Sequence, residues 1–243
     1  MVYNINKFTM KTSILAGLLL WSNFWLQAQS QQELEYAAYL KAGKSLWERC
    51  VDQANRQHGG ESFEAAMAAY GLLNSTMATE DETTFDDNVD QVVDHLKAII
   101  KEKPEWGEPQ AVLSTVYGLK MAYSPMKGII YGSKSGSLIE SAVKLQPESP
   151  LVQKLYGSYK LYTPSMFGGD AEEAVKAFTL AVQLYEDLDS SGNWLYLDAL
   201  VHLALSYRKI QQTDQAISVL EKAISLEPDF NWAKAILASY QKN

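Results

Sequence analysis

The chain has 243 residues, of which 47% are hydrophobic, and its formal net charge at pH 7 is −8. This composition is typical of one folded domain, and the acidic balance argues against a protein that binds the phosphate backbone of nucleic acids. The single cysteine, Cys50, excludes an internal disulfide and a zinc site built from cysteines. Because Cys50 lies on an apolar helical stripe, we expect a buried thiol.

Residues 1–30 have the pattern of a secretory signal peptide. Lys7 and Lys11 are their only charges, a largely apolar stretch runs from Ile14 to Leu26, and Ala28 and Ser30 are the small residues that a cleavage site requires. The uninterrupted apolar run is short for a membrane span, so we expect cleavage near Ser30 and no stable span afterwards. No cysteine follows the run, which argues against a lipoprotein. The pattern predicts a periplasmic or secreted protein, with an uncleaved N-terminal anchor as the alternative.

The rest of the chain shows helical periodicity. We expect a first helix from Glu33 to Asn55, ended by the paired glycines at 59–60, and a second helix that starts at Ser62. An acidic, exposed connection is expected at residues 79–86. The next helix is predicted over residues 87–101, and Pro104 follows it.

Two central segments match each other at an offset of 39 residues. Tyr117-Gly118 falls on Tyr156-Gly157, and Pro125 falls on Pro164. Each segment reads as a helix, a proline-containing connection and a second helix. The connections are predicted at residues 124–136 and 163–169, and insertions of this kind often lie on a binding face of a repeat array.

Residues 197–230 form the most regular unit. In its first half, apolar and small residues recur at i, i+3, i+4 and i+7, which is one face of a helix. Thr213 or Asp214 is expected to cap the second helix, and Pro228 prevents its continuation. The signature positions are Leu200, Leu203, Ala204, Tyr207, Ala216, Leu220, Ala223 and Pro228. At these positions the segment resembles a tetratricopeptide repeat.

The resemblance implies an all-α array of antiparallel helix hairpins, an α–α superhelix, over residues 31–243. Divergent repeats are expected at about 62–104, 109–147 and 148–186, with a final capping helix over 232–241. It also implies that the first helix of each repeat lines a concave face that binds an extended or helical peptide. In the regular repeat the lining residues would be Asp198, Val201, Leu205, Arg208 and Lys209.

The middle of the chain is rich in tyrosine and methionine. Tyr117 and Tyr156 join the candidate binding residues, because a tyrosine offers an apolar body and a polar tip to a partner. Packing between helices is the other explanation of their spacing. The region that contains Met121, Met126 and Met166 is where we expect a groove.

Catalytic and metal-binding patterns are incomplete in this sequence. The glycines before Asp170 lack the remainder of a phosphate-binding loop, and Asp170 with Glu173 predicts a helix-capping box instead. The acidic stretch from Asp187 to Asp198 has a calcium-loop spacing but lacks its glutamate. The histidines are dispersed. We therefore expect no catalytic residues, no metal and no cofactor.

Two functions remain open at this point. The first is an exported, non-enzymatic scaffold or adaptor that mediates protein–protein contacts. The second is a small-ligand binding protein that resembles accessory components of solute transporters. The connections at 124–136 and 163–169 motivate the second hypothesis, because long inserted loops can enclose a cavity.

Overall fold

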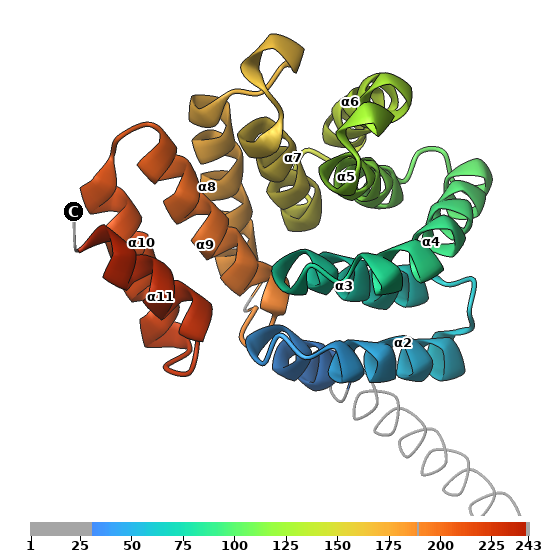
Figure 1. Cartoon of the computed structure of the whole chain (residues 1–243), viewed down its shortest axis with the longest axis horizontal. Helices are drawn as coiled ribbons and strands as arrows, with labels where there is room; N and C mark the ends of the chain where they lie inside the picture. The colour runs from blue at the N-terminus through green and yellow to red at the C-terminus, as the bar shows by residue number, and fades with distance from the viewer. Residues whose placement is uncertain (1–30, 189, 242–243) are drawn as a thin grey trace, which may run out of the picture.

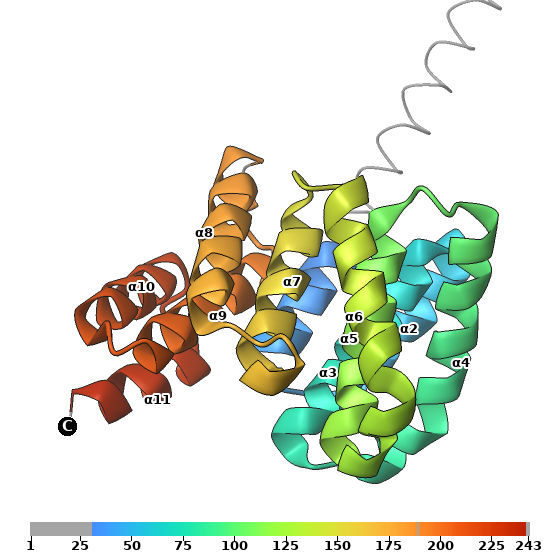
Figure 2. The same ribbon diagram turned by 90° about the horizontal axis from the view of Figure 1, so that it is seen from above.

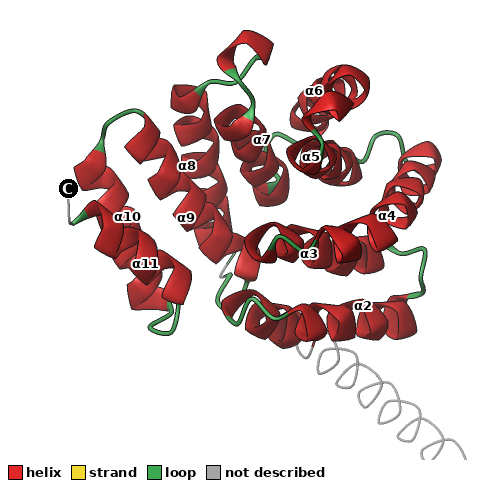
Figure 3. Cartoon of the chain, viewed as in Figure 1, coloured by secondary structure: helices red, strands yellow, loops and turns green. Residues whose placement is uncertain are grey.

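The computed structural model of the chain describes residues 31–188 and 190–241, and the predicted signal peptide lies outside them. Every regular element of the described residues is helical (Figure 3), which confirms the predicted all-α fold. Residues 31–40, called here the 31–40 helix, precede the first labelled helix. The others are α2 (Lys44–His58), α3 (Phe63–Thr79), α4 (Glu82–Glu102), α5 (Gly107–Tyr123), η1 (Pro125–Lys127), α6 (Gly128–Leu145), α7 (Pro150–Tyr162), η2 (Ser165–Phe167), α8 (Ala171–Asp187), α9 (Trp194–Lys209), α10 (Thr213–Leu226) and α11 (Asn231–Tyr240).

The helices pack in sequential pairs that wind into a curved array (Figures 1 and 2). Small residues allow the paired helices to approach closely. Ser114 of α5 and Ser135 of α6 each donate a hydroxyl hydrogen bond to the other's carbonyl oxygen, at 2.9 and 3.0 Å. In the next pair, a Cβ added to Gly157 of α7 would lie 2.8 Å from the Phe178 ring of α8. The side-chain size at these positions therefore sets the spacing between helices.

The predicted unbroken first helix is wrong. The 31–40 helix ends before Ala42, which has a left-handed φ of 46°, and α2 begins only after Gly43. The predicted end of α2 is confirmed, since His58 is followed by Gly59 at a φ of 86°. Ser62 caps α3 as expected, with its side chain accepting a hydrogen bond from the Ala65 N–H at 3.1 Å. The break at 41–43 lets the 31–40 helix leave the direction of α2.

The acidic connection predicted at residues 79–86 is also mostly helix. Asp81 caps α4 by accepting a hydrogen bond from the Thr84 N–H at 3.0 Å. Phe85 is fully buried, and its burial favours helix in a stretch whose charge suggested a loop. Carboxylates in the first turn of a helix are stabilised by the positive end of the helix dipole, so the acidic residues suit this position.

The predicted connection at 124–136 is wrong, because α6 begins at Gly128 directly after η1. One of the two inserted loops behind the ligand-binding alternative is therefore absent. The predicted offset of 39 residues is seen in the structure at the two prolines, because Pro125 and Pro164 each stand where the turn after α5 or α7 begins. The two helices end at equivalent positions, Tyr123 and Tyr162. However, α5 has 17 residues and α7 has 13, so α5 begins about one turn earlier.

The connection predicted at 163–169 is confirmed and contains η2. Asp170 caps α8, since its Oδ1 accepts hydrogen bonds from the N–H groups of Glu172 and Glu173, both at 3.0 Å. The reciprocal half of the predicted capping box is not formed, because the Asp170 N–H donates to the Lys160 carbonyl at 2.9 Å. The loop is thus tied back to α7.

The predicted cap of α10 is wrong. Thr213 is the first residue of the helix, and its hydroxyl accepts a hydrogen bond from Arg208 at 2.9 Å. The N-cap position is Gln212, whose side chain makes no capping bond. The predicted stop before Pro228 and the final helix are both present, as α10 ends at Leu226 and α11 follows.

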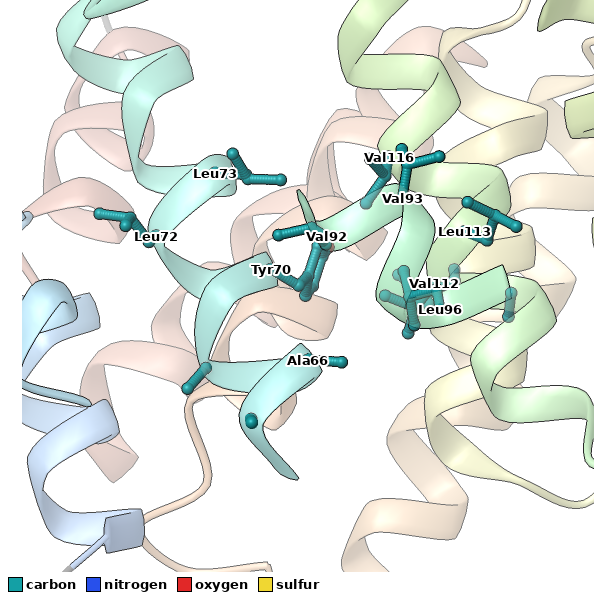
Figure 4. Close-up of a cluster of buried hydrophobic side chains, with 14 of the residues drawn as sticks. Ala66, Tyr70, Leu72, Leu73, Val92, Val93, Leu96, Val112, Leu113 and Val116 are labelled. Atoms are coloured by element: carbon teal, nitrogen blue, oxygen red, sulfur yellow. The ribbon is translucent and has the colours of Figure 1, made fainter. Parts of the chain in front are cut away.

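The buried side chains form two hydrophobic clusters. The first is centred on α2 to α5, and Figure 4 shows how α3, α4 and α5 contribute side chains to it. The second is centred on α8 to α11. Tyr36 and Tyr39 of the 31–40 helix pack against both clusters. Cys50 is fully buried in the first cluster as predicted, and burial raises the pKa of its thiol to about 12.

None of the helices among the described residues has the length and apolar character that crossing a membrane would require.

Candidate functional site

The 31–40 helix closes the array by packing against the C-terminal repeat. The Tyr36 hydroxyl donates a hydrogen bond to Glu227 at 3.1 Å, across 191 residues of sequence. The Tyr39 hydroxyl donates to Asp198 Oδ1 at 3.0 Å. The ring of Tyr39 lies 5.3 Å from that of Trp194 and 5.6 Å from that of Phe230, between ring centroids. The first described helix thus lies against residues of α9 and the segment before α11.

A buried ion pair lies under this contact. Lys154 Nζ of α7 is 2.6 Å from Asp198 Oδ2 of α9, and both side chains are 2% exposed. The Lys154 ammonium also lies 5.9 Å from the ring centroids of Tyr70 in α3 and Trp194 in α9. Removing two charges from water costs several kcal/mol per ion, so the hydrogen bond from Tyr39 and the adjacent aromatic faces help to offset that cost.

The electrostatics of the pair favour the charged forms. Burial alone would raise the pKa of the Asp198 carboxyl, but the Lys154 ammonium and then His202 hold it well below its usual range. Burial would lower the pKa of Lys154, and the Asp198 carboxylate raises it instead. Burial, followed by the same carboxylate, raises the pKa of the Tyr39 phenol well above its usual range. The tyrosine therefore remains a hydrogen-bond donor.

His202 completes the cluster one helical turn after Asp198. Its Nδ1 lies 2.8 Å from the Asp198 carbonyl oxygen and 3.2 Å from Oδ2. Both neighbours can only accept a hydrogen bond, so Nδ1 carries a proton. The imidazole ring stacks on Phe178 at 5.7 Å and meets the edge of Trp232 at 5.6 Å, between ring centroids. This enclosed arrangement holds helices together, and it leaves no open face at which a substrate could meet the pair.

The described residues contain no group of three or more histidine, cysteine or acidic side chains placed to hold a metal. Asp198, which occupies the last position of the calcium-like spacing, forms an ion pair with Lys154 instead. Asp189, within that spacing, lies outside the described residues.

The predicted concave residues of α9 separate into two groups. Asp198 and Val201 are buried, at 1% and 0% exposure, and Leu205 packs at the margin of the second cluster. Arg208 and Lys209 are exposed at the end of α9. The Arg208 guanidinium lies 5.4 Å from the Tyr240 ring centroid, and Lys209 Nζ donates to the Leu161 carbonyl at the end of α7, at 2.5 Å.

The two candidate tyrosines lie elsewhere in the array. Tyr117 of α5 is buried in the first cluster and stacks on Tyr131 of α6, with ring centroids 4.7 Å apart. Tyr156 of α7 is half-buried, and the Lys160 ammonium lies 5.5 Å from its ring centroid. Both tyrosines therefore have packing partners of their own.

Exposed apolar side chains gather at the turns after α5 and α7. Met126 is 83% exposed, Ile129 91%, Met166 80% and Phe167 66%. Met126 and Met166 belong to the region selected from composition, whereas Ile129 and Phe167 were missed because nothing in the sequence marks them as exposed. Figure 2 shows both turns on the same side of the array. The surface called the turn edge below comprises Met126, Ile129, Met166, Phe167, Arg208 and Lys209.

Comparison with known proteins identifies the architecture. Residues 197–230 match the sequence profile of the tetratricopeptide repeat family. The structure is similar to TTC0263, a thermophilic TPR protein in Thermus thermophilus, with a TM-score of 0.55 and 18% identity over 88% of this chain and 99% of that one. The protein has a tetratricopeptide-repeat fold. This confirms the resemblance drawn from the residues of the regular repeat.

Weaker likenesses extend to two other solved structures. MamA matches with a TM-score of 0.47 and 21% identity, over 67% of this chain and 81% of that one. YrrB, described as a TPR protein with an unusual peptide-binding site, matches with a TM-score of 0.43 and 19% identity, over 78% of this chain and 82% of that one. A search of curated proteins found no match to the sequence.

Proposed function

We propose that this protein is an exported, non-enzymatic scaffold that binds another protein through its turn edge. The observation that carries the proposal is the exposure of Met126, Ile129, Met166 and Phe167, between 66% and 91%, on two successive repeats. Exposed apolar side chains gathered on one side of a folded protein are typical of an interaction surface. The tetratricopeptide-repeat fold supports this assignment, because such arrays present extended surfaces to their ligands.

The concave face of the C-terminal repeat is a poorer candidate while the 31–40 helix remains in place. Tyr39 covers Asp198 there, and Val201 is fully buried. A peptide could reach these side chains only by displacing that helix. The turn edge needs no such rearrangement, so binding there retains the full packing of the array.

The composition of the turn edge indicates the chemistry of its partner. Its apolar side chains come from η1, the first turn of α6 and η2, and Arg208 and Lys209 add positive charge at the end of α9. We expect a protein segment with exposed leucine-like or aromatic anchors, because such anchors dominate binding energy at interfaces. Carboxylates beside those anchors would pair with the basic residues.

The test uses affinity capture with paired variants. Met166→Ser with Phe167→Ser should abolish recovery of the wild-type partner while the thermal melt changes little, because both side chains are exposed. Leu188→Ser is the matched control, since Leu188 is equally exposed at 66% but lies in the connection between α8 and α9. Equal recovery with wild type and both variants would reject the turn edge.

Export is proposed from the pattern of residues 1–30. Fractionation of the source cells, followed by N-terminal sequencing of the mature chain, tests it. A mature N-terminus near residue 31 in the envelope or the medium supports export, whereas an intact N-terminus in the cytosol contradicts it.

A further inference from the structure

A second surface is an open groove between α4, α5 and α6. The groove has a volume of about 490 Å³ and is open to solvent. The half-buried Ile100 and Leu138 supply apolar surface to it, and the buried Leu113 and Tyr117 lie beneath them. α5 thus supplies part of an apolar lining between α4 and α6.

Lysines stand on both sides of this apolar lining. Lys97 and Lys101 lie one turn apart on α4, and Lys134 faces them from α6. Lys101 and Lys134 make no ion pair among the described residues, and Lys97 pairs only with exposed Asp94 of its own helix, at 3.1 Å. An exposed pair of this kind contributes about 0–1 kcal/mol. In a chain whose net charge is −8, this is a local concentration of available positive charge.

We propose that the groove binds an acidic amphipathic helix of a partner protein. The apolar face of that helix would cover Ile100 and Leu138, and its flanking carboxylates would meet lysines on both sides. Apolar anchors spaced at i, i+3, i+4 and i+7 are the usual form of helix-in-groove recognition. A fatty acid fits less well, because its single carboxylate could satisfy only one side of the groove.

Fluorescence anisotropy tests the proposal with a defined probe. The probe is a fluorescein-labelled helical peptide with leucines at i, i+3, i+4 and i+7 and glutamates on both flanks of the leucines. Lys101→Glu with Lys134→Glu should weaken its binding at least about tenfold, because two attractions become repulsions across a short distance. Raising the salt concentration should weaken wild-type binding as well.

The controls separate this groove from general electrostatics. Lys176→Glu with Lys234→Glu makes the same change of charge at exposed lysines of α8 and α11, and should leave the affinity nearly unchanged. Leu138→Glu should abolish binding by a second route. A peptide with lysine in place of glutamate should not bind.

Several outcomes would overturn the proposal: equal binding of the acidic and basic peptides, no effect of the Lys101 and Lys134 changes, or binding of dodecanoate but not of the peptide. The turn-edge variant Met166→Ser with Phe167→Ser should bind the peptide normally. If that variant loses the peptide while the lysine variants keep it, the groove is refuted and the turn edge stands. The proposal for the groove and the proposal for the turn edge are therefore tested independently.

Discussion

Removing one partner of the Lys154–Asp198 ion pair should destabilise the fold far more than removing both. Lys154→Met leaves the Asp198 carboxylate buried without its cation, and Asp198→Asn leaves the ammonium without its anion. Breaking a buried pair from one side typically costs about 3–5 kcal/mol. For a domain of this size, each kcal/mol shifts the melting temperature by about 2–4 °C. Each single variant should therefore melt roughly 6–20 °C below the wild type.

The double variant, Lys154→Met with Asp198→Leu, should recover most of that loss. Replacing a buried pair by apolar residues is often neutral or stabilising, although Tyr39 would then need conversion to phenylalanine because its hydroxyl loses its acceptor. The measurement is urea unfolding followed by circular dichroism. Losses below about 1 kcal/mol in the single variants, or a double variant no more stable than the single variants, would refute the coupling.

An exposed pair provides the matched control. Lys176 and Glu173 of α8 lie 3.3 Å apart, with side chains 74% and 36% exposed. Pairs of this kind in helices contribute about 0.3–0.5 kcal/mol. Lys176→Met should therefore change the free energy of unfolding by much less than Lys154→Met. A control loss as large as the buried loss would contradict the argument that burial makes the Lys154–Asp198 pair more costly to break.

The pH dependence of the same variants has a defined sign. The pKa of Asp198 is lowered in the folded state, so its contribution is present above the unfolded value of about 3.9 and is lost as the pH falls below it. The pKa of Lys154 is raised, so its contribution is present below about 10.4 and is lost as the pH rises through the folded value. The stability difference between wild type and Asp198→Asn should shrink on acidification below about pH 4.

Three further predictions concern single positions. A Cβ at Gly71 would lie 2.1 Å from the Trp47 ring, so Gly71→Ala should cost about 1–3 kcal/mol in urea unfolding, whereas Gly118→Ala in the open middle of α5 should stabilise by about 0.5–1 kcal/mol. Cys50 should react with a thiol reagent only as fast as the protein unfolds, because it is buried and the pKa of its thiol is raised to about 12; rapid labelling of the native protein would contradict this. Glu80 has a left-handed φ of 55° at the end of α3, so Glu80→Gly should raise the melting temperature, and a lower melting temperature would show that its side chain is needed.

The repeat architecture could be predicted from the sequence because helices that pack against each other carry small and apolar residues at regular spacing. The small and apolar positions of residues 197–230 specify how α9 meets α10, and both helices appear where expected. Errors came where a local signal competed with burial. Acidic residues suggested a loop at 79–86, but burial of Phe85 keeps that stretch helical. A proline-containing connection was predicted at 124–136, but most of that stretch belongs to α6, where Gly136 lies close to Tyr159 of α7.

The candidate site was harder to predict than the fold. Position within the repeat marked Asp198 as a groove residue, and no local pattern could show that Lys154, forty-four positions earlier, neutralises it in the interior. Tyr39 and Asp198 are 159 residues apart in the sequence. Helical periodicity describes only neighbouring turns, so it cannot predict a contact between residues so far apart. By contrast, Arg208 and Lys209 are exposed as expected. Basic residues in the last turn of a helix are usually solvent-exposed, so the repeat pattern alone was enough to predict this. Their role in binding stays a prediction.

Closure of the array by the 31–40 helix also affects how the chain folds. An open repeat array can fold from any nearest-neighbour pair and can fray from its ends. Here the Tyr36–Glu227 and Tyr39–Asp198 contacts tie the first described helix to the last repeat. Contacts between distant parts of a sequence slow folding, and these two cannot form until the C-terminal repeat has been synthesised. The C-terminal repeat therefore completes the packing surface of the 31–40 helix, and loss of either segment should loosen the other.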